Sequence, residues 1–277
     1  MCLLAVAFCV GMGMHAQSLR EKQAAETLLN DSAAQPRLVT RATLYGVGVA
    51  NVFDTYLSPQ EYKGIEFRIA RESMRMTAWM DGNLSRQTFF QGNVSYTHNK
   101  ADNNNSLSAL LNWNYGLHYH FPLTRNFRLL AGAVGDINGG FVYNLRNGNN
   151  PAQARAYLNL DASVMAIWQL RIRRFPLTLR YQANLPVAGV MFMPHYGESY
   201  YEIFSLGNSD GVVRFTSLHN QPSLRQMLTA DFPVGRIKMR FAYLWDVQQA
   251  KLNGIRTHSY SHSFLVGLVK ELYLFRN

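Results

Sequence analysis

The chain has little cysteine, little charge and no apolar run long enough for a membrane helix. Its two cysteines, Cys2 and Cys9, both lie near the N-terminus. Beyond them no disulfide, thiol nucleophile or cysteine metal site can form. Charged residues make up 16% of the 277 residues, which is low for a soluble domain. The composition therefore excludes a disulfide scaffold and argues against an ordinary soluble domain.

An apolar run covers residues 3–14 and is followed by Ala16. It is shorter than the roughly 20 residues of a membrane-spanning helix, and no later run approaches that length. A short apolar run that ends at a small residue is typical of a signal peptide. We therefore expect a signal peptide over residues 1–16. Helix formers in the next stretch predict a periplasmic leader over residues 17–39 that is either a short helix or a mobile segment.

Low charge without apolar runs favours a β-barrel, and the stretch from Arg236 to Asp246 shows why. Successive side chains of a strand point to opposite faces, so alternation places two chemistries on two faces. One face of this stretch is apolar or aromatic: Ile237, Met239, Phe241, Tyr243 and Trp245. The other carries charge at Arg236, Lys238, Arg240 and Asp246. This pattern is typical of a strand between lipid and a polar lumen.

The same alternation recurs along the chain, with polar turns between the segments. We therefore predict an all-β, transmembrane, antiparallel up-and-down barrel over residues 40–277. Its strands number about twelve, with ten as the alternative. The difference lies in the irregular segment 186–222, which either adds two short wall strands or forms an external hairpin over the mouth. A barrel of this size has a narrow lumen filled by side chains.

The formal charge of +10 favours attraction to anionic lipid headgroups. Nucleic acid is not expected as a partner, because the basic residues are spread along strands at alternate positions. No glycine-rich phosphate loop is present, and we expect no cofactor. His118 and His120 share a lumen face, but two imidazoles without a third ligand do not make a metal site. We therefore expect no metal.

Ser217 and His219 form the candidate catalytic pair. They are two residues apart, so in an extended segment they share one face, and a serine with a base in reach can attack an acyl ester. The alternative interpretation is a polar strand end at the water interface.

The densest mixture of aromatic and ionisable side chains forms a candidate ligand-binding cluster. Such a mixture binds a glycan or lipid headgroup by stacking and hydrogen bonds, or forms part of an aromatic girdle. Its members are His195, Tyr196, Glu198, Tyr200, Tyr201 and Glu202.

Charged residues at inward positions predict a charge network in the lumen. An excess of cations there would favour anion passage, whereas paired charges would pack a narrow lumen. The predicted members are Glu66, Arg68, Asp161, Arg180, Asp231, Arg236, Lys238 and Arg240.

The stretches 194–204 and 217–264, including Leu218-His-Asn-Gln-Pro222 and Thr257-His-Ser-Tyr-Ser-His-Ser-Phe264, resemble an uncharacterised family. It is a family of Bacteroidota outer-membrane barrel proteins, classed as a domain of unknown function. The resemblance runs over most of the mature chain. It implies a barrel fold and an outer-membrane location, and it carries no established site residues.

We expect a small, monomeric, non-enzymatic barrel of the bacterial outer membrane with a structural, binding or accessory role at the cell surface. The alternatives are an outer-leaflet lipid hydrolase or acyl-modifying enzyme that uses Ser217 and His219, and a narrow anion-permeable channel. The expected partners are outer-membrane lipid and lipopolysaccharide, with another outer-membrane or periplasmic protein as a further candidate.

Overall fold

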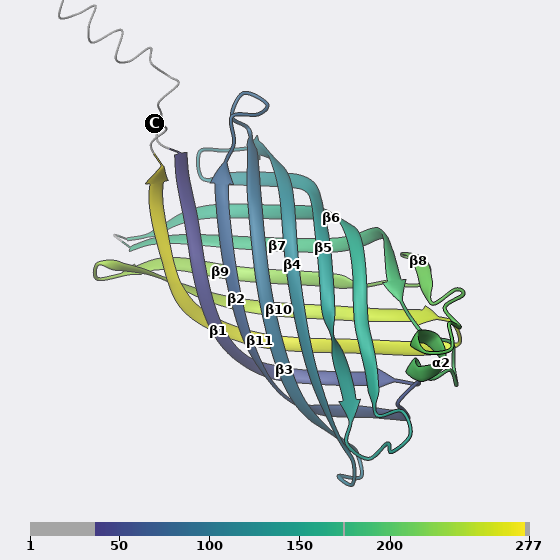
Figure 1. The fold of residues 1–277 in the computed structure, drawn as a ribbon. Helices are drawn as coiled ribbons and strands as arrows, with labels where there is room; N and C mark the ends of the chain where they lie inside the picture. Colours follow the sequence, from purple (N-terminus) through teal and green to yellow (C-terminus); the bar gives the residue numbers. More distant parts are fainter. Residues whose placement is uncertain (1–36, 174, 275–277) are drawn as a thin grey trace, which may run out of the picture. The chain divides into compact units, whose positions relative to one another are not determined.

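The structure is a computed structural model, and it describes residues 37–173 and 175–274. The predicted signal peptide and nearly all of the predicted leader lie outside the described residues. Residues 39–272 form one compact unit, which is a β-barrel (Figure 1). Within the described ranges, no helix is long and apolar enough to cross a membrane.

Ten strands close the barrel, each pairing with its neighbours in an antiparallel sheet. They are β1 (Arg37–Asp54), β2 (Ser58–Met76), β3 (Leu84–Asn99), β4 (Asn105–Pro122), β5 (Phe127–Asn144), β6 (Ala152–Ile172), β7 (Phe175–Phe192), β9 (Leu224–Val234), β10 (Ile237–Leu252) and β11 (Ile255–Leu274). β11 lies beside β1, and β9 follows β7 in the wall. The alternative of ten wall strands is thus confirmed, and the irregular segment adds one further strand, β8, instead of two.

The alternating pattern of β10 produces the two faces that the sequence predicts. Arg240 and Leu244 point inward and are 3% and 1% exposed, whereas Phe241 points outward and is 52% exposed. The same alternation runs through β3 and β4. Because the outward residues are largely apolar and the inward ones largely polar, the barrel is built to meet lipid outside.

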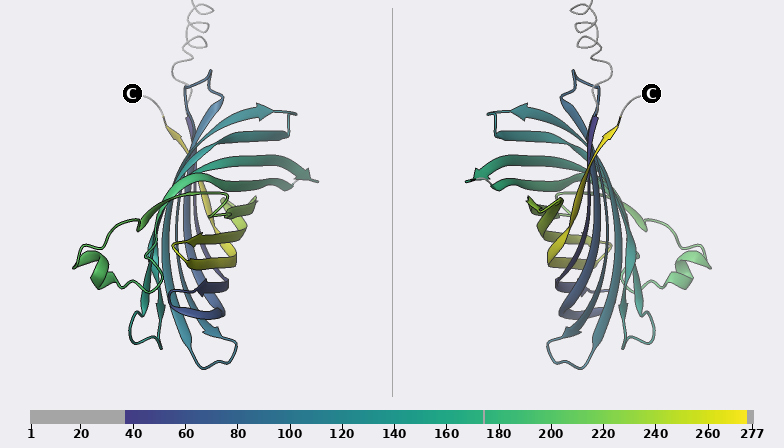
Figure 2. Two further views of the ribbon diagram at one scale, coloured as in Figure 1. Left: turned by 90° about the vertical axis from the view of Figure 1, so that its right-hand side faces the viewer. Right: turned by 90° about the vertical axis from the view of Figure 1, so that its left-hand side faces the viewer.

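The connections differ between the two ends of the barrel. One end, called the turn end, holds the connections 77–83, 123–126 and 235–236 and the β6–β7 turn. The other end, called the loop end, holds the connections 55–57, 100–104, 145–151, 193–223 and 253–254. The connection 193–223 is the longest and contains α2 (Tyr200–Phe204) and β8 (Val213–Ser217). Figure 2 shows α2 projecting beyond the strands.

β8 lies in line with β9 along the same edge of β7, so it does not add a strand to the ring of the barrel. It pairs with residues 188–192 of β7, and β9 pairs with residues 178–184 of the same strand. The rest of the connection bridges the mouth, since Asn253 in the β10–β11 turn donates to the carbonyl oxygens of Met193 and Gly211 at 2.6 and 2.9 Å. The segment therefore both extends the wall and crosses the mouth.

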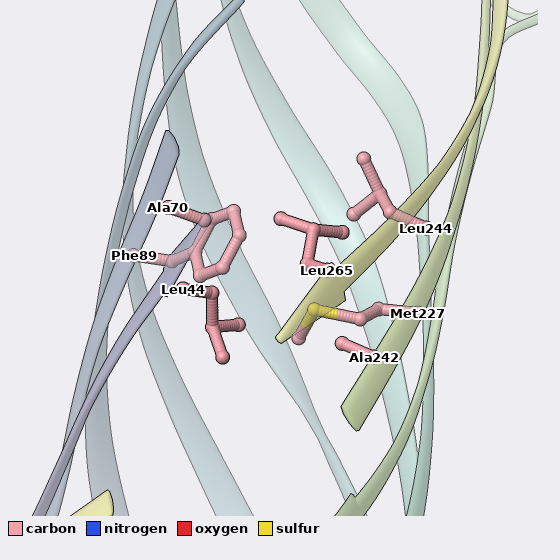
Figure 3. Packing of buried hydrophobic residues seen from close by; sticks show 7 residues of the cluster. All are labelled: Leu44, Ala70, Phe89, Met227, Ala242, Leu244 and Leu265. Atoms are coloured by element: carbon pink, nitrogen blue, oxygen red, sulfur yellow. The ribbon is translucent and has the colours of Figure 1, made fainter. Parts of the chain in front are cut away.

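The lumen is packed in alternating apolar and charged layers. From the turn end to the loop end, the inward residues of β2 are Met74, Glu72, Ala70, Arg68 and Glu66. Ala70 belongs to a buried apolar cluster in the lumen (Figure 3), with Leu44, Phe89, Met227, Ala242, Leu244 and Leu265. Charged residues lie on both sides of this cluster, so the lumen is filled by side chains, as the predicted size implies.

Glycines allow the first and last strands to approach closely. A Cβ atom at Gly48 of β1 would collide with the backbone oxygen of His262 in β11, and one at Gly267 of β11 would collide with that of Thr43 in β1. Glycine is used where backbones must come this near. A side chain at either position would therefore disturb the pairing of β1 with β11, as it would at Gly64, Gly132 and Gly140 in other strand pairs.

Candidate functional site

An ion pair crosses the lumen on the turn-end side of the apolar cluster. Glu72 on β2 accepts from Arg180 Nη2 on β7 at 2.7 Å and also pairs with Arg240 of β10. Arg240 makes two further bonds to the carboxylate of Asp231 at 2.6 and 2.7 Å. In a ring of ten strands β2 and β7 lie opposite each other. The Arg180–Glu72 pair therefore ties the two walls together through the barrel centre.

A second charged layer lies on the loop-end side of the cluster. Arg68 donates to Glu66 at 2.9 Å, and its nearest nitrogen lies 3.6 Å from the carboxylate of Asp246. Asp246 also pairs with Arg225 at 3.2 Å. Arg225 donates across the lumen to Asn112 on β4 at 2.9 Å. All these side chains are buried, so the arrangement packs the lumen with paired charge.

The structure places most of the predicted network in these layers. Arg236 is exposed in the β9–β10 turn, and Lys238 pairs with Glu271 at 2.5 Å near the turn end. Asp161 is buried among the lumen side chains. Glu72 is central to the network although the predicted set omits it. Glu72 continues the inward register of Glu66, Arg68 and Ala70. The alternation along β2 therefore predicts an inward position for Glu72 as well.

Little free space remains between the lumen side chains. Two cavities there have volumes of about 20 Å³ each, enough for about one water molecule. His118 is fully buried, and its Nε2 lies 2.9 Å from the hydroxyl of Ser163. Among the described residues no cluster of histidine, cysteine and carboxylate side chains could hold a metal ion.

The predicted ligand-binding cluster is divided between structural and exposed roles. Ser199 and Glu202 form a capping box at the start of α2, and the N–H and hydroxyl of Ser199 lower the pKa of the Glu202 carboxyl. Tyr200 accepts from the amide of Ala154 at 2.7 Å, and burial raises its pKa. The Glu202 cap and the Tyr200 hydrogen bond thus hold α2 in place.

Other members of the cluster line the outside of the same segment. Tyr196 and Tyr201 are 69% and 66% exposed. The carbonyl oxygen of Glu198 accepts from the hydroxyl of Tyr56 in the β1–β2 turn at 2.9 Å. Burial, followed by the nearby Tyr200, raises the pKa of Tyr56 to about 12, so this donor stays protonated. His195 Nε2 lies 3.2 Å from the backbone oxygen of Asp210.

Ser217 and His219 lie in contact, but across the turn that follows β8 and not along an extended segment. The serine Oγ lies 2.5 Å from His219 Nδ1, and the imidazole is exposed. Asn220 Oδ1 accepts from the amide of Ser217 at 2.8 Å, and its amide group donates to Phe215 O at 3.0 Å. Asn220 therefore covers the free edge of β8, as edge strands require, and positions the pair in a turn.

The pair has only part of a hydrolase machinery. Among the described residues, no carboxylate is hydrogen-bonded to His219. The amide N–H of Ser217 already bonds to Asn220, so this amide is not free to stabilise an oxyanion. The arrangement supplies a nucleophile and a base, without an orienting acid.

A groove opens beside this pair, between β8 and the end of β10. β8 pairs with β7 alone. The turn after β8 connects to β10 instead, because Lys251 N donates to Asn220 O at 2.8 Å. The groove has a volume of about 660 Å³. Its lining consists of His195, Arg214, Phe215, His219, Asn220, Lys251, Leu252, Asn253 and Gly254.

A family model described as "Protein of unknown function (DUF3316)" matches residues 1–277. The chain belongs to this family. The predicted membership in a family of unknown function is thereby confirmed. None of the curated proteins matches the DUF3316 chain.

Several solved structures are similar to this DUF3316 chain. The transport unit of the autotransporter AIDA-I from Escherichia coli has a TM-score of 0.46 at 10% identity, over 86% of this chain and 90% of that one. The outer membrane protease OmpT from Escherichia coli has a TM-score of 0.43 at 9% identity, over 86% and 97%. The translocator domain of the autotransporter NalP from Neisseria meningitidis has a TM-score of 0.39 at 11% identity, over 95% and 96%.

Proposed function

We propose that this chain is an outer-membrane protein of a Bacteroidota bacterium that does not conduct ions and that serves a structural, binding or accessory role at the cell surface. The observation that carries the proposal is the Arg180–Glu72 pair, which joins opposite walls through the lumen. A lumen closed by paired side chains leaves the ends of the barrel as its working surfaces. The loop end carries the long connection 193–223, and it is the surface we assign to binding.

The orientation follows from general barrel architecture. In outer-membrane barrels the periplasmic turns are short and the external loops are longer. The connection 193–223 makes the loop end the longer one here. We therefore assign the loop end to the outside of the cell, where outer-leaflet lipid and lipopolysaccharide lie beside it. Another outer-membrane or periplasmic protein is a further candidate partner of the barrel.

Planar bilayers test whether the barrel conducts. We expect the purified, folded protein to insert without stable single-channel steps, because paired charges and apolar side chains fill the lumen. A porin reconstituted in the same bilayers serves as the positive control. A reproducible conductance, above all one selective for anions, would contradict the proposal and favour the narrow channel.

The Ser217–His219 contact favours a second candidate function, hydrolysis of an acyl ester in the outer leaflet. In such a reaction Ser217 Oγ attacks the acyl carbonyl carbon while its proton passes to His219 Nδ1. The proton then goes to the leaving alcohol, and water releases the fatty acid from the acyl-serine. The 2.5 Å contact supports this candidate, and the missing acid partner argues against it.

Acyl release from phospholipid and lipopolysaccharide separates the two candidates. If the chain is a hydrolase, Ser217→Ala lowers the rate to the uncatalysed level because the nucleophile is lost. Ser209→Ala is the matched control in the same connection, and it should leave the rate unchanged. A wild-type protein that releases no acyl chain from either lipid eliminates the hydrolase candidate.

A further inference from the structure

The groove between β8 and β10 carries positive charge without acidic partners. Arg214 and Lys251 line it, and both are exposed. The ion pairs among the described residues include neither of them. Among the described residues, the Arg214 side chain makes one hydrogen bond, from Nε to Asn253 Oδ1 at 2.9 Å. This bond orients the guanidinium and leaves its terminal nitrogens for a ligand.

Two imidazoles lie beside these cations. The position of a Cβ atom on Gly211 is 3.3 Å from Arg214 Nη2 and 3.5 Å from His195 Nε2. The two side chains therefore converge on one place. His219 lines the same groove. Guanidinium, ammonium and imidazole N–H groups gathered in one concave site are the donors that bind a phosphate group.

Apolar side chains lie next to the charged groove on β8. Val213 and Phe215 are 61% and 62% exposed, and Leu218 in the following turn is 46% exposed. Phe215 is paired with Val190 of β7, itself 42% exposed on the outer face of the wall. The apolar outer face of the barrel thus continues to the edge of the groove. A ligand with an anionic head and acyl chains fits both parts.

We propose that this groove binds the phosphate-bearing headgroup of an anionic glycolipid in the outer leaflet. The inference rests on the proposed location of the loop end at the cell surface. Arg214 and Lys251 hold the phosphate, and His219, whose Nδ1 faces Ser217, donates to it from Nε2. Phe215 contacts the acyl region, and His195, whose Nε2 bonds to Asp210 O, closes the side of the groove.

Binding of defined lipids to the detergent-purified, full-length protein tests the proposal. The probes are diphosphorylated lipid A, the same lipid without phosphate, phosphatidylglycerol and inorganic phosphate. We expect diphosphorylated lipid A to bind most tightly. The double variant Arg214→Gln/Lys251→Gln should weaken that binding by at least about tenfold, because charged hydrogen bonds are lost. Arg125→Gln, at the turn end, removes a distant exposed cation and should change nothing.

Each other outcome overturns the proposal. Equal binding of the dephosphorylated lipid shows that phosphate is not recognised. Inorganic phosphate that binds as tightly as lipid A indicates a free-phosphate site instead of a lipid site, and equal binding of phosphatidylglycerol removes the preference for a glycolipid. Unchanged binding by a double variant that migrates as a folded barrel removes the groove from the site. Because bilayer conductance is measured separately, the failure of lipid binding and the failure of the non-conducting proposal can be told apart.

Discussion

Replacing Glu72 with alanine is expected to destabilise the folded barrel by about 3–5 kcal/mol, the cost of removing one member of a buried ion pair. Its carboxylate is buried and accepts from Arg180 Nη2 at 2.7 Å and from Gln87 Nε2 at 2.5 Å. Arg240 keeps Asp231 after the change, but Arg180 loses its only ion-pair partner among the described residues. The free energy of unfolding in lipid vesicles, measured by urea titration, gives the loss.

Two further variants make this measurement specific. Glu61→Ala is the matched control on the same strand, because Glu61 pairs with Lys63 at 3.7 Å on an exposed surface. Such pairs contribute about 0–1 kcal/mol. The double variant Glu72→Ala/Arg180→Met removes the unpaired cation as well and should recover part of the stability. If Glu72→Ala costs no more than Glu61→Ala, the cross-lumen pair does not hold the barrel.

Replacing Leu111 with arginine is expected to destabilise the membrane-inserted barrel by about 2–4 kcal/mol, as charge on a lipid-facing strand does near the bilayer midplane. Leu111 is 58% exposed, points outward and lies near the middle of β4 opposite Gly92 of β3. Because Leu111 lies on the outer face of the barrel, its exposed side chain meets lipid. Unfolding from vesicles measures the difference in free energy.

Leu123→Arg is the control for this change. Leu123 is also 58% exposed, but it lies in the β4–β5 turn outside the strands. A surface substitution in water changes stability by about 0.5 kcal/mol or less. Similar small effects at both positions would show that the outer face of β4 does not meet lipid.

The strands could be predicted from the sequence because the two-residue alternation of a strand shows which side chains face lipid and which face the lumen. On β4 and β10 the alternation of polar and apolar residues places most side chains on the observed face, although Ala242 and Leu244 are apolar and point into the lumen. The strand number depends on where short segments pair, which local pattern does not encode. β8 has only five residues and lies along β7 in line with β9, so it extends an existing wall position.

The site could be predicted only where its contacts are local. Ser217 and His219 meet because they are two residues apart in a turn. The Arg180–Glu72 contact depends on the ring size, since only a barrel of ten strands places β2 opposite β7. α2 did have a sequence signal, because Ser199 and Glu202 have the spacing of a capping box.

Labelling of single cysteines on intact cells tests directly whether the loop end faces the outside of the cell. Residues 17–277 contain no cysteine, so an introduced thiol in this range has no competitor there. Tyr201→Cys lies at the loop end in α2, and Leu123→Cys lies at the turn end. We predict that a membrane-impermeant maleimide labels Tyr201→Cys on intact cells and labels Leu123→Cys only after the outer membrane is permeabilised. Labelling of Leu123→Cys on intact cells, with Tyr201→Cys protected, would contradict this prediction.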